Sequence, residues 1–123
     1  MKRIYDVDSR LKVKNISDLL DSPVVIRVVD FEEKDSKEFA EQMSKAHNTG
    51  QPIIPIVIDS YGGQAYSLLS MIGEIRASKL PVATICMGKA MSCGAVLLTC
   101  GAEGMRFMCP ESTVMIHDVR SMH

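Results

Sequence analysis

The feature that most constrains the fold of this chain is a regular alternation of β-branched runs with segments of helical spacing. Three runs are rich in Val and Ile and are typical of strands: residues 24–29, 52–59 and 80–88. Each is followed by a helical pattern, and two short apolar runs at 104–110 and 112–119 complete the series. This alternation predicts an α/β fold in which right-handed crossovers lay helices against a parallel sheet.

Local patterns place the individual elements. Asp35 and Glu38 form a predicted capping box at the start of the first helix, which residues 48–50 should end. The apolar stripe of this helix should comprise Phe39, Met43 and Ala46, and that of the next helix, which runs to about Ser78, Leu68, Leu69, Ile72 and Ile75. A third helix should run to about Cys100. The run at 24–29 reads as a strand buried on both faces, and Pro55 favours an edge or early strand position.

Composition bounds the class of protein. With 123 residues and neither repeats nor linkers, residues 1–123 are expected to form a single domain. The net charge of -1, without a basic cluster, argues against nucleic acid and anionic membranes as partners. Residues 1–20 lack a signal-peptide core, and no apolar run is long enough to span a membrane, so a cytoplasmic protein is expected. The four cysteines, spaced 7, 7 and 9 apart, fit reduced thiols better than a zinc site or disulfides.

Two strand-to-helix junctions are the candidate functional positions, because active groups in α/β sheets gather where strands end. One is Tyr61-Gly62-Gly63, and the other contains Ser92 and Cys93. Ser92 at a helix start could be an N-cap or a nucleophile. In the second case the N–H of Cys93 and an N–H of the glycine pair could donate to the oxyanion that forms on the attacked carbonyl group.

A nucleophilic serine also needs a base, and the chain has three histidines. His47 lies in a polar stretch and His123 is the last residue, so His117, inside an apolar run, is the candidate base. Taken locally, these residues leave a serine hydrolase and a purely structural role about equally open. The Gly-x-Ser-x-Gly elbow of α/β-hydrolases does not match, because Ala90 occupies the first glycine position.

Three motifs in order, "SYGG", "ICMGKAMSCGAVLLTCGAEGMRF" and "PESTVMIHD", resemble the Clp protease family over about residues 53–118. The resemblance implies a crotonase-like α/β fold and a serine endopeptidase. Ser92 would then be the nucleophile and His117 the general base, with the N–H groups of Gly63 and Cys93 as the oxyanion hole. It implies no metal or other cofactor. It further implies unfolded polypeptides as substrates, an AAA+ unfoldase of the Clp type as partner, and homo-oligomeric rings that enclose a chamber.

Two departures from the family pattern stand out. Tyr61 occupies the position of the usual proline before the glycine pair. The family's third triad residue, an aspartate, and its handle helix follow well after the histidine, whereas this sequence ends at His123, so it is expected to correspond to the N-terminal two-thirds or so of such a subunit. Asp118 is poorly placed as a substitute, because neighbouring strand residues point to opposite faces. Asp59, the other aspartate considered for this role, is close in sequence to the glycine turn, and nothing in the sequence indicates that it reaches His117.

Three alternatives remain at this level. The chain could be a catalytically incomplete structural subunit of the same family. It could be a crotonase-type acyl-CoA enzyme, although no carboxylate is obviously placed as its base. Cys93 could itself be the nucleophile, but adjacent helical residues point about 100° apart, and the pattern selects Ser92.

Overall fold

The predicted α/β architecture is confirmed by the structure, a computed structural model that describes residues 5–6 and 16–116. Its elements are β1 (Tyr5–Asp6), α1 (Ile16–Leu20), β2 (Ile26–Val28), α2 (Glu33–Ala46), β3 (Ile54–Ser60), α3 (Ala65–Ala77), β4 (Val82–Met91), α4 (Cys93–Leu98), β5 (Arg106–Met108) and β6 (Thr113–Met115). Within these residues the strands form one sheet in the order β1-β5-β4-β3-β2, with β6 also paired to β4. All pairings are parallel except that of β1 with β5.

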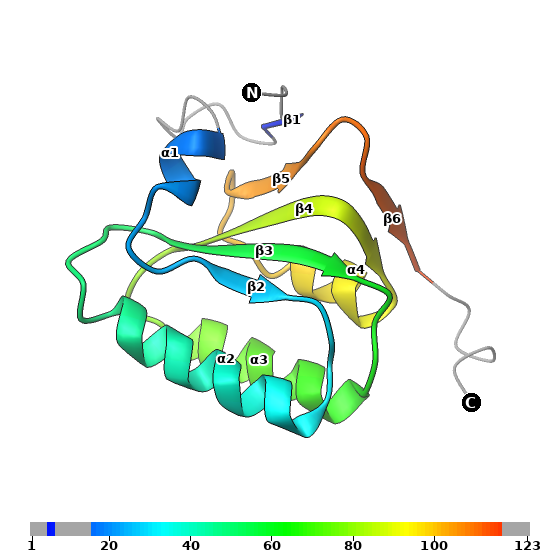
Figure 1. Ribbon diagram of the computed structural model, residues 1–123, viewed down its shortest axis with the longest axis horizontal. Helices are drawn as coiled ribbons and strands as arrows, with labels where there is room; N and C mark the ends of the chain where they lie inside the picture. The colour runs from blue at the N-terminus through cyan, green and yellow to red at the C-terminus, as the bar shows by residue number, and fades with distance from the viewer. Residues whose placement is uncertain (1–4, 7–15, 117–123) are drawn as a thin grey trace.

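The sheet separates two apolar clusters. Helices α2 and α3 lie together against one face, and α1 lies on the other (Figure 1). The first cluster joins these two helices and α4 to inward residues such as Ile56 and Ile58, both fully buried. The second cluster packs α1 residues Ile16 and Leu19 against Ile85 and its neighbours. Strands β3 and β4, which end at the two candidate junctions, are therefore held from both sides.

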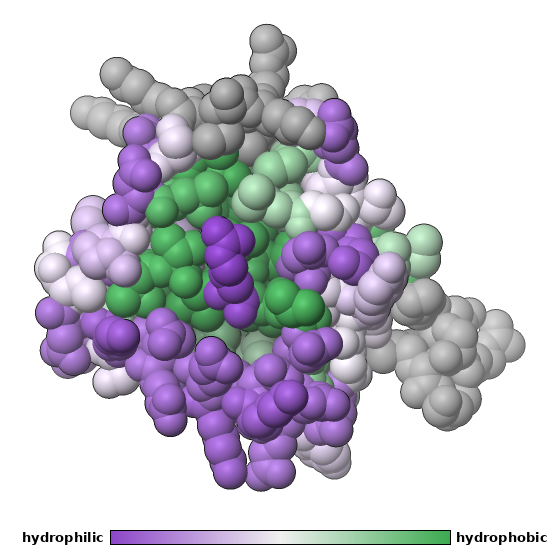
Figure 2. All heavy atoms as spheres, in the orientation of Figure 1, coloured by the Kyte–Doolittle hydropathy of each residue, from purple (hydrophilic) through white to green (hydrophobic). Residues whose placement is uncertain are grey.

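Strand β2 differs from its prediction as a strand buried on both faces. Ile26 and Val28 are buried, whereas Arg27 between them is exposed and Val29 is 57% exposed. The reason is the alternation of side chains along the strand: Ile26 and Val28 belong to the cluster under α2 and α3, whereas Arg27 points to the opposite face of the sheet, at the edge of the described strands. Figure 2 shows apolar atoms at the centre of the face that β2 presents, surrounded by hydrophilic ones.

Helix α2 has the predicted apolar stripe, with Phe39, Met43 and Ala46 buried, but its capping box lies one turn earlier than predicted. Glu32 is the N-cap, and Asp35 is the third helical residue, whose Oδ2 accepts the Glu32 N–H at 2.9 Å. The predicted pair of Asp35 and Glu38 is therefore wrong. Two acidic pairs three residues apart overlap here, Glu32 with Asp35 and Asp35 with Glu38. Glu32 has the extended backbone that is typical of an N-cap, so the helix begins after Glu32 and the first pair forms the box.

Helix α3 confirms most of its predicted stripe, since Leu68 and Ile75 are buried and Ile72 packs against the core, but the prediction is wrong at Leu69. Met71 lies inward together with Leu68 and Ile75, whereas Leu69 is 58% exposed. Positions 68, 71 and 75 share one face at 3.6 residues per turn, and Leu69 is rotated about 100–160° from them. A Leu-Leu pair at the start of a helix does not reveal which member faces the core.

The remaining differences concern element ends. Pro55 lies early in a strand paired on both sides, so the early position is confirmed and the edge position is wrong. Strand β4 continues three residues past its predicted end at Gly88, and α4 stops at Leu98 instead of Cys100. The sequence did not suggest α1. The two C-terminal strands are confirmed as β5 and β6, while His117 and Asp118 lie outside the described residues.

Candidate active site

Ser92 occupies the turn between β4 and α4 in an unusual backbone conformation. Its φ of 53° and ψ of -116° make it the one non-glycine residue with positive φ in the described part of the chain. Such a conformation costs on the order of 1–3 kcal/mol and persists only where the surrounding structure enforces it. Ser92 stands at the N-cap position, yet its side chain makes no capping hydrogen bond. The capping role that local statistics favour is therefore not what its hydroxyl does.

Two contacts hold Ser92 in this conformation. Its N–H donates to the carbonyl oxygen of Met115 in β6 at 2.9 Å, and its carbonyl oxygen accepts the N–H of Val96 at 3.2 Å. The first bond fastens the turn to a strand, and the second begins α4. Strand β6 thereby connects Ser92 to the segment that continues toward His117, two residues after Met115.

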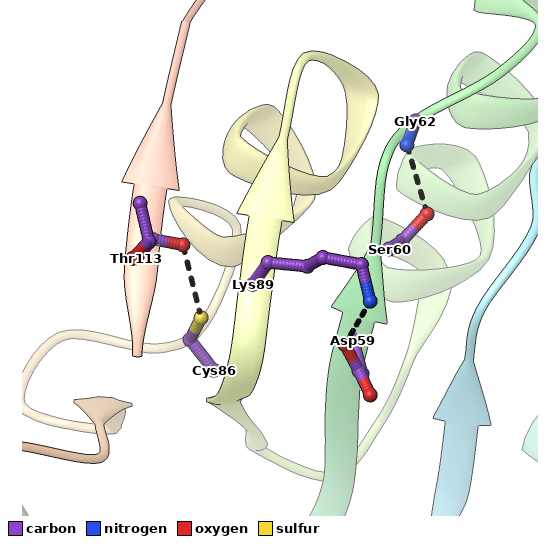
Figure 3. Close-up of polar contacts among 6 residues, drawn as sticks. All are labelled: Asp59, Ser60, Gly62, Cys86, Lys89 and Thr113. Atoms are coloured by element: carbon purple, nitrogen blue, oxygen red, sulfur yellow. Dashed lines mark hydrogen bonds and ion pairs between the residues drawn. The ribbon is translucent and has the colours of Figure 1, made fainter. Parts of the chain in front are cut away.

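Gly62 lies directly against Ser92. A Cβ added at Gly62 would be 2.9 Å from the Cβ of Ser92, 3.0 Å from the Met91 carbonyl oxygen and 3.3 Å from the Cys93 nitrogen. The residue also has a φ of +109°, a region that side chains rarely adopt. Its N–H donates to Ser60 Oγ at 3.0 Å (Figure 3). Only glycine fits this position, because any side chain would collide with the turn that contains Ser92.

Gly63 is held between the core and α4. Its missing Cβ would lie 2.8 Å from the Cβ of Phe31, and the next residue, Gln64, donates its N–H to the Phe31 carbonyl at 2.8 Å. On the other side, the thiol of Cys93 donates to the Gly63 carbonyl oxygen at 3.4 Å. The two residues predicted to supply the oxyanion hole are therefore neighbours in space.

Cys93 combines a buried thiol with a free helix terminus. Cys93 is 2% exposed and its thiol donates to the Gly63 carbonyl oxygen, so the thiol is directed into the protein. Its N–H, in contrast, belongs to the first residue of α4, where backbone donors have no intrahelical acceptor. Such a donor suits a developing negative charge on an atom near Ser92.

Beside this turn lies an ion pair that sequence reasoning missed. Lys89 Nζ lies 2.6 Å from Asp59 Oδ1 (Figure 3). The same atom lies 4.5 Å from the centroid of the Tyr61 ring. The hydrogen bond to Asp59 raises the pKa of Lys89 above its ordinary range, so this lysine stays charged. Asp59 is thus occupied by Lys89. The two residues are 30 apart in sequence, and the strand irregularity between them hides their pairing from any simple alternation pattern.

The surroundings of the turn contain one more thiol. Cys86 is fully buried in β4, with its Sγ 3.8 Å from the Thr113 carbonyl oxygen, and burial raises the pKa of this thiol.

Among residues 5–6 and 16–116, no cluster of three His, Cys, Asp or Glu side chains has the arrangement of a metal site. None of the helices described here combines the length and the apolar character that a membrane crossing requires.

Comparison with known proteins agrees with these features. The family model described as Clp protease matches residues 8–122. The ATP-dependent Clp protease proteolytic subunit of Deinococcus radiodurans is 45% identical over 64 residues, which are 52% of this chain and 31% of that relative. The aligned part is therefore less than a third of that relative's length. Since the family model covers nearly the whole sequence, the resemblance seen in the three motifs is confirmed, and the chain belongs to the Clp protease family.

Proposed function

We propose that this protein is a serine endopeptidase in which Ser92 attacks the peptide carbonyl. The observation that carries the proposal is the strained backbone of Ser92, packed against a glycine that admits no side chain. A strained strand-to-helix turn exposes a nucleophile and aims the first N–H groups of the helix at the same point. Membership of the Clp protease family supports the same reading.

The proposed reaction uses three kinds of group. His117 takes the hydroxyl proton of Ser92 as the oxygen attacks, and it later gives a proton to the leaving amine. The N–H groups of Gly63 and Cys93 donate to the oxyanion of the tetrahedral intermediate. Water then hydrolyses the acyl-enzyme, with His117 again acting as base. The role of His117 rests on the family motif, because this residue lies outside the described part of the chain.

The proposal extends to substrate and assembly. Unfolded polypeptides are the proposed substrates, cut in a chamber formed by homo-oligomeric rings, with an AAA+ unfoldase as partner and the cytoplasm as location. The printed name of the Deinococcus relative, an ATP-dependent proteolytic subunit, supports a partner that uses ATP. The native mass of the full-length protein should accordingly be a multiple of the subunit mass, and a monomer that cleaves peptides at full rate would contradict the chamber.

A fluorophosphonate probe tests the nucleophile directly. The probe should modify Ser92 of the full-length protein, as located by peptide mass spectrometry, and Ser92→Ala should abolish both labelling and cleavage of a fluorogenic peptide. Cys93→Ala is the matched control, because it removes the neighbouring thiol and keeps the backbone N–H. Labelling that persists in Ser92→Ala, or that disappears in Cys93→Ala while the protein stays folded, would contradict the assignment.

A further inference from the structure

Strand β4 contains an irregularity directly before the nucleophile turn. Ile58 pairs with Cys86, and the next registered pair is Ser60 with Ala90, so a step of two residues in β3 (60 - 58) faces a step of four in β4 (90 - 86). Gly88, at the centre of this bulge, has a φ of +96°. The bulge therefore sets how far Ser92 advances relative to the end of β3, where the glycine pair begins.

The carboxylate of Asp59 occupies the hollow of this bulge. A Cβ added at Gly88 would lie 2.7 Å from Asp59 Oδ1, 3.0 Å from Cγ and 3.3 Å from Oδ2. Asp59 thus stands where a side chain on β4 would otherwise be. Gly88 is the residue that permits this contact, both through its conformation and through its lack of a Cβ.

Lys89, the residue after Gly88 on β4, forms an ion pair with the carboxylate of Asp59 on β3. Figure 3 shows its side chain extending from β4 across to Asp59 on β3. Its ammonium group also lies over the ring of Tyr61, which directly precedes Gly62. The side chain of Lys89 is 26% exposed and that of Asp59 is 49% exposed, so the pair is partly shielded from solvent.

A proton-transfer role does not fit this lysine. Its short hydrogen bond to Asp59 favours the charged form, whereas a general base must be neutral when it accepts a proton. What Lys89 does link are three points: the bulge, the end of β3 and the residue before the glycine pair. These points adjoin the two turns in which Gly62 and Ser92 lie against each other.

We propose that Asp59, Lys89 and Tyr61 form a positioning clamp that fixes the glycine turn against Ser92 and so sets the geometry of the oxyanion hole. The inference rests on the proposed serine peptidase function for its kinetic consequence. The clamp residues touch neither the reacting atoms nor the substrate in this scheme. They act through the backbone of Gly62, Gly63 and Cys93.

The kinetic test compares Lys89→Met and Asp59→Asn with the wild-type full-length protein. Misplacing reacting groups by about 1 Å can cost about 100-fold in rate, so each variant should lower the fluorophosphonate labelling rate and kcat by about 10- to 100-fold. The KM for a fluorogenic peptide should change little, because the clamp makes no contact with the peptide. The double variant should be no slower than the slower single variant, since both remove the same interaction. Lys89→Arg, which keeps the charge, should recover most of the rate.

Lys37→Met is the matched control. It removes the same charge from an exposed pair on α2, where Lys37 Nζ lies 4.0 Å from Glu33 Oε1, and it should leave the labelling rate unchanged. Labelling of Lys89→Met and Asp59→Asn at the wild-type rate would overturn the clamp.

A structural readout separates failure of the clamp from failure of the proposed function. If wild-type Ser92 is not labelled, the peptidase proposal fails, and the clamp is then judged from the backbone amide resonances of Gly62, Gly63 and Cys93. Shifts of these amides in Lys89→Met beyond those in Lys37→Met support the clamp. Amides that stay at their wild-type positions in Lys89→Met overturn it.

Discussion

Gly62 and Gly73 should respond in opposite directions to the same added methyl group. At Gly62 the new Cβ meets Ser92 and Met91 at 2.9–3.0 Å in a left-handed conformation, whereas at Gly73 no atom lies within 4 Å. Gly62→Ala should destabilise the fold by about 1–3 kcal/mol and abolish labelling of Ser92. Gly73→Ala, inside α3, should stabilise it by about 0.5–1 kcal/mol without slowing the probe. Denaturant unfolding and labelling rates measure both effects, and a Gly62→Ala protein that labels normally would contradict the described contact.

The thiols should differ sharply in reactivity. Burial raises the pKa of Cys86 above its ordinary value of 9.0, so near neutral pH it is a neutral thiol with no exposed surface. Cys100 and Cys109, which are partly exposed, should be alkylated by iodoacetamide before Cys86, which should react only when the protein unfolds. Peptide mass spectrometry over a time course reads the order. Early modification of Cys86 in folded protein would show that β4 is more open than described.

Among single residues, the sequence motifs identified the turn but not its clamp. The placement of Ser92, Gly63 and Cys93 at two neighbouring strand ends was predictable, because the strand runs and the small residues that follow them are local features of the sequence. The Asp59–Lys89 pair was not, since its geometry depends on the bulge at Gly88, and only the registered strands reveal that bulge. Sequence spacing also could not show that the hydroxyl of Ser92, although at the N-cap position, makes no capping hydrogen bond to α4.

At the level of elements, the start of α2 offers a test between two overlapping capping boxes. In the observed one, Asp35 accepts the N–H of Glu32, so Asp35→Ala should cost about 0.5–1.5 kcal/mol. Asp35→Asn keeps an acceptor oxygen and should lose less. Glu38→Ala, which would break the box predicted from sequence, should stay within about 0.5 kcal/mol of wild type. Unfolding free energies decide the matter, and a larger loss in Glu38→Ala than in Asp35→Ala would restore the sequence prediction.

The alternation of strands and helices was predictable because β-branched runs and helical spacing are local signals. Burial was harder to predict, since it depends on neighbours that are distant in sequence. Strand β2 reads as a buried run, yet Arg27 points away from the cluster that buries its two neighbours. In α3, Leu69 points outward, and Met71 takes its place in the inward stripe. The short helix α1 has too few residues for periodicity to reveal it.

At the scale of the whole molecule, the two apolar clusters should differ in how they influence the site. Phe31 is fully buried in the cluster under α2 and α3, and its backbone and Cβ bear directly on Gly63. Ile85, equally buried, belongs to the cluster on the opposite face and has no such contact with the glycine turn. Changes in the cluster under α2 and α3 should therefore affect the position of the glycine turn more than changes in the cluster on the opposite face of the sheet do.

Phe31→Ala and Ile85→Ala test this asymmetry. Both should lower the free energy of unfolding substantially, by about 3–5 and about 2–5 kcal/mol respectively, because each leaves a cavity in a packed core. At a temperature well below both midpoints, Phe31→Ala should also slow labelling of Ser92 by about 10-fold or more, because the backbone and Cβ of residue 31, which lie against Gly63, lose the ring that anchors them in the core. Folded Ile85→Ala should label at nearly the wild-type rate. Equal slowing in the two folded variants would mean that the whole sheet, and not the Phe31–Gly63 contact, positions the glycine turn.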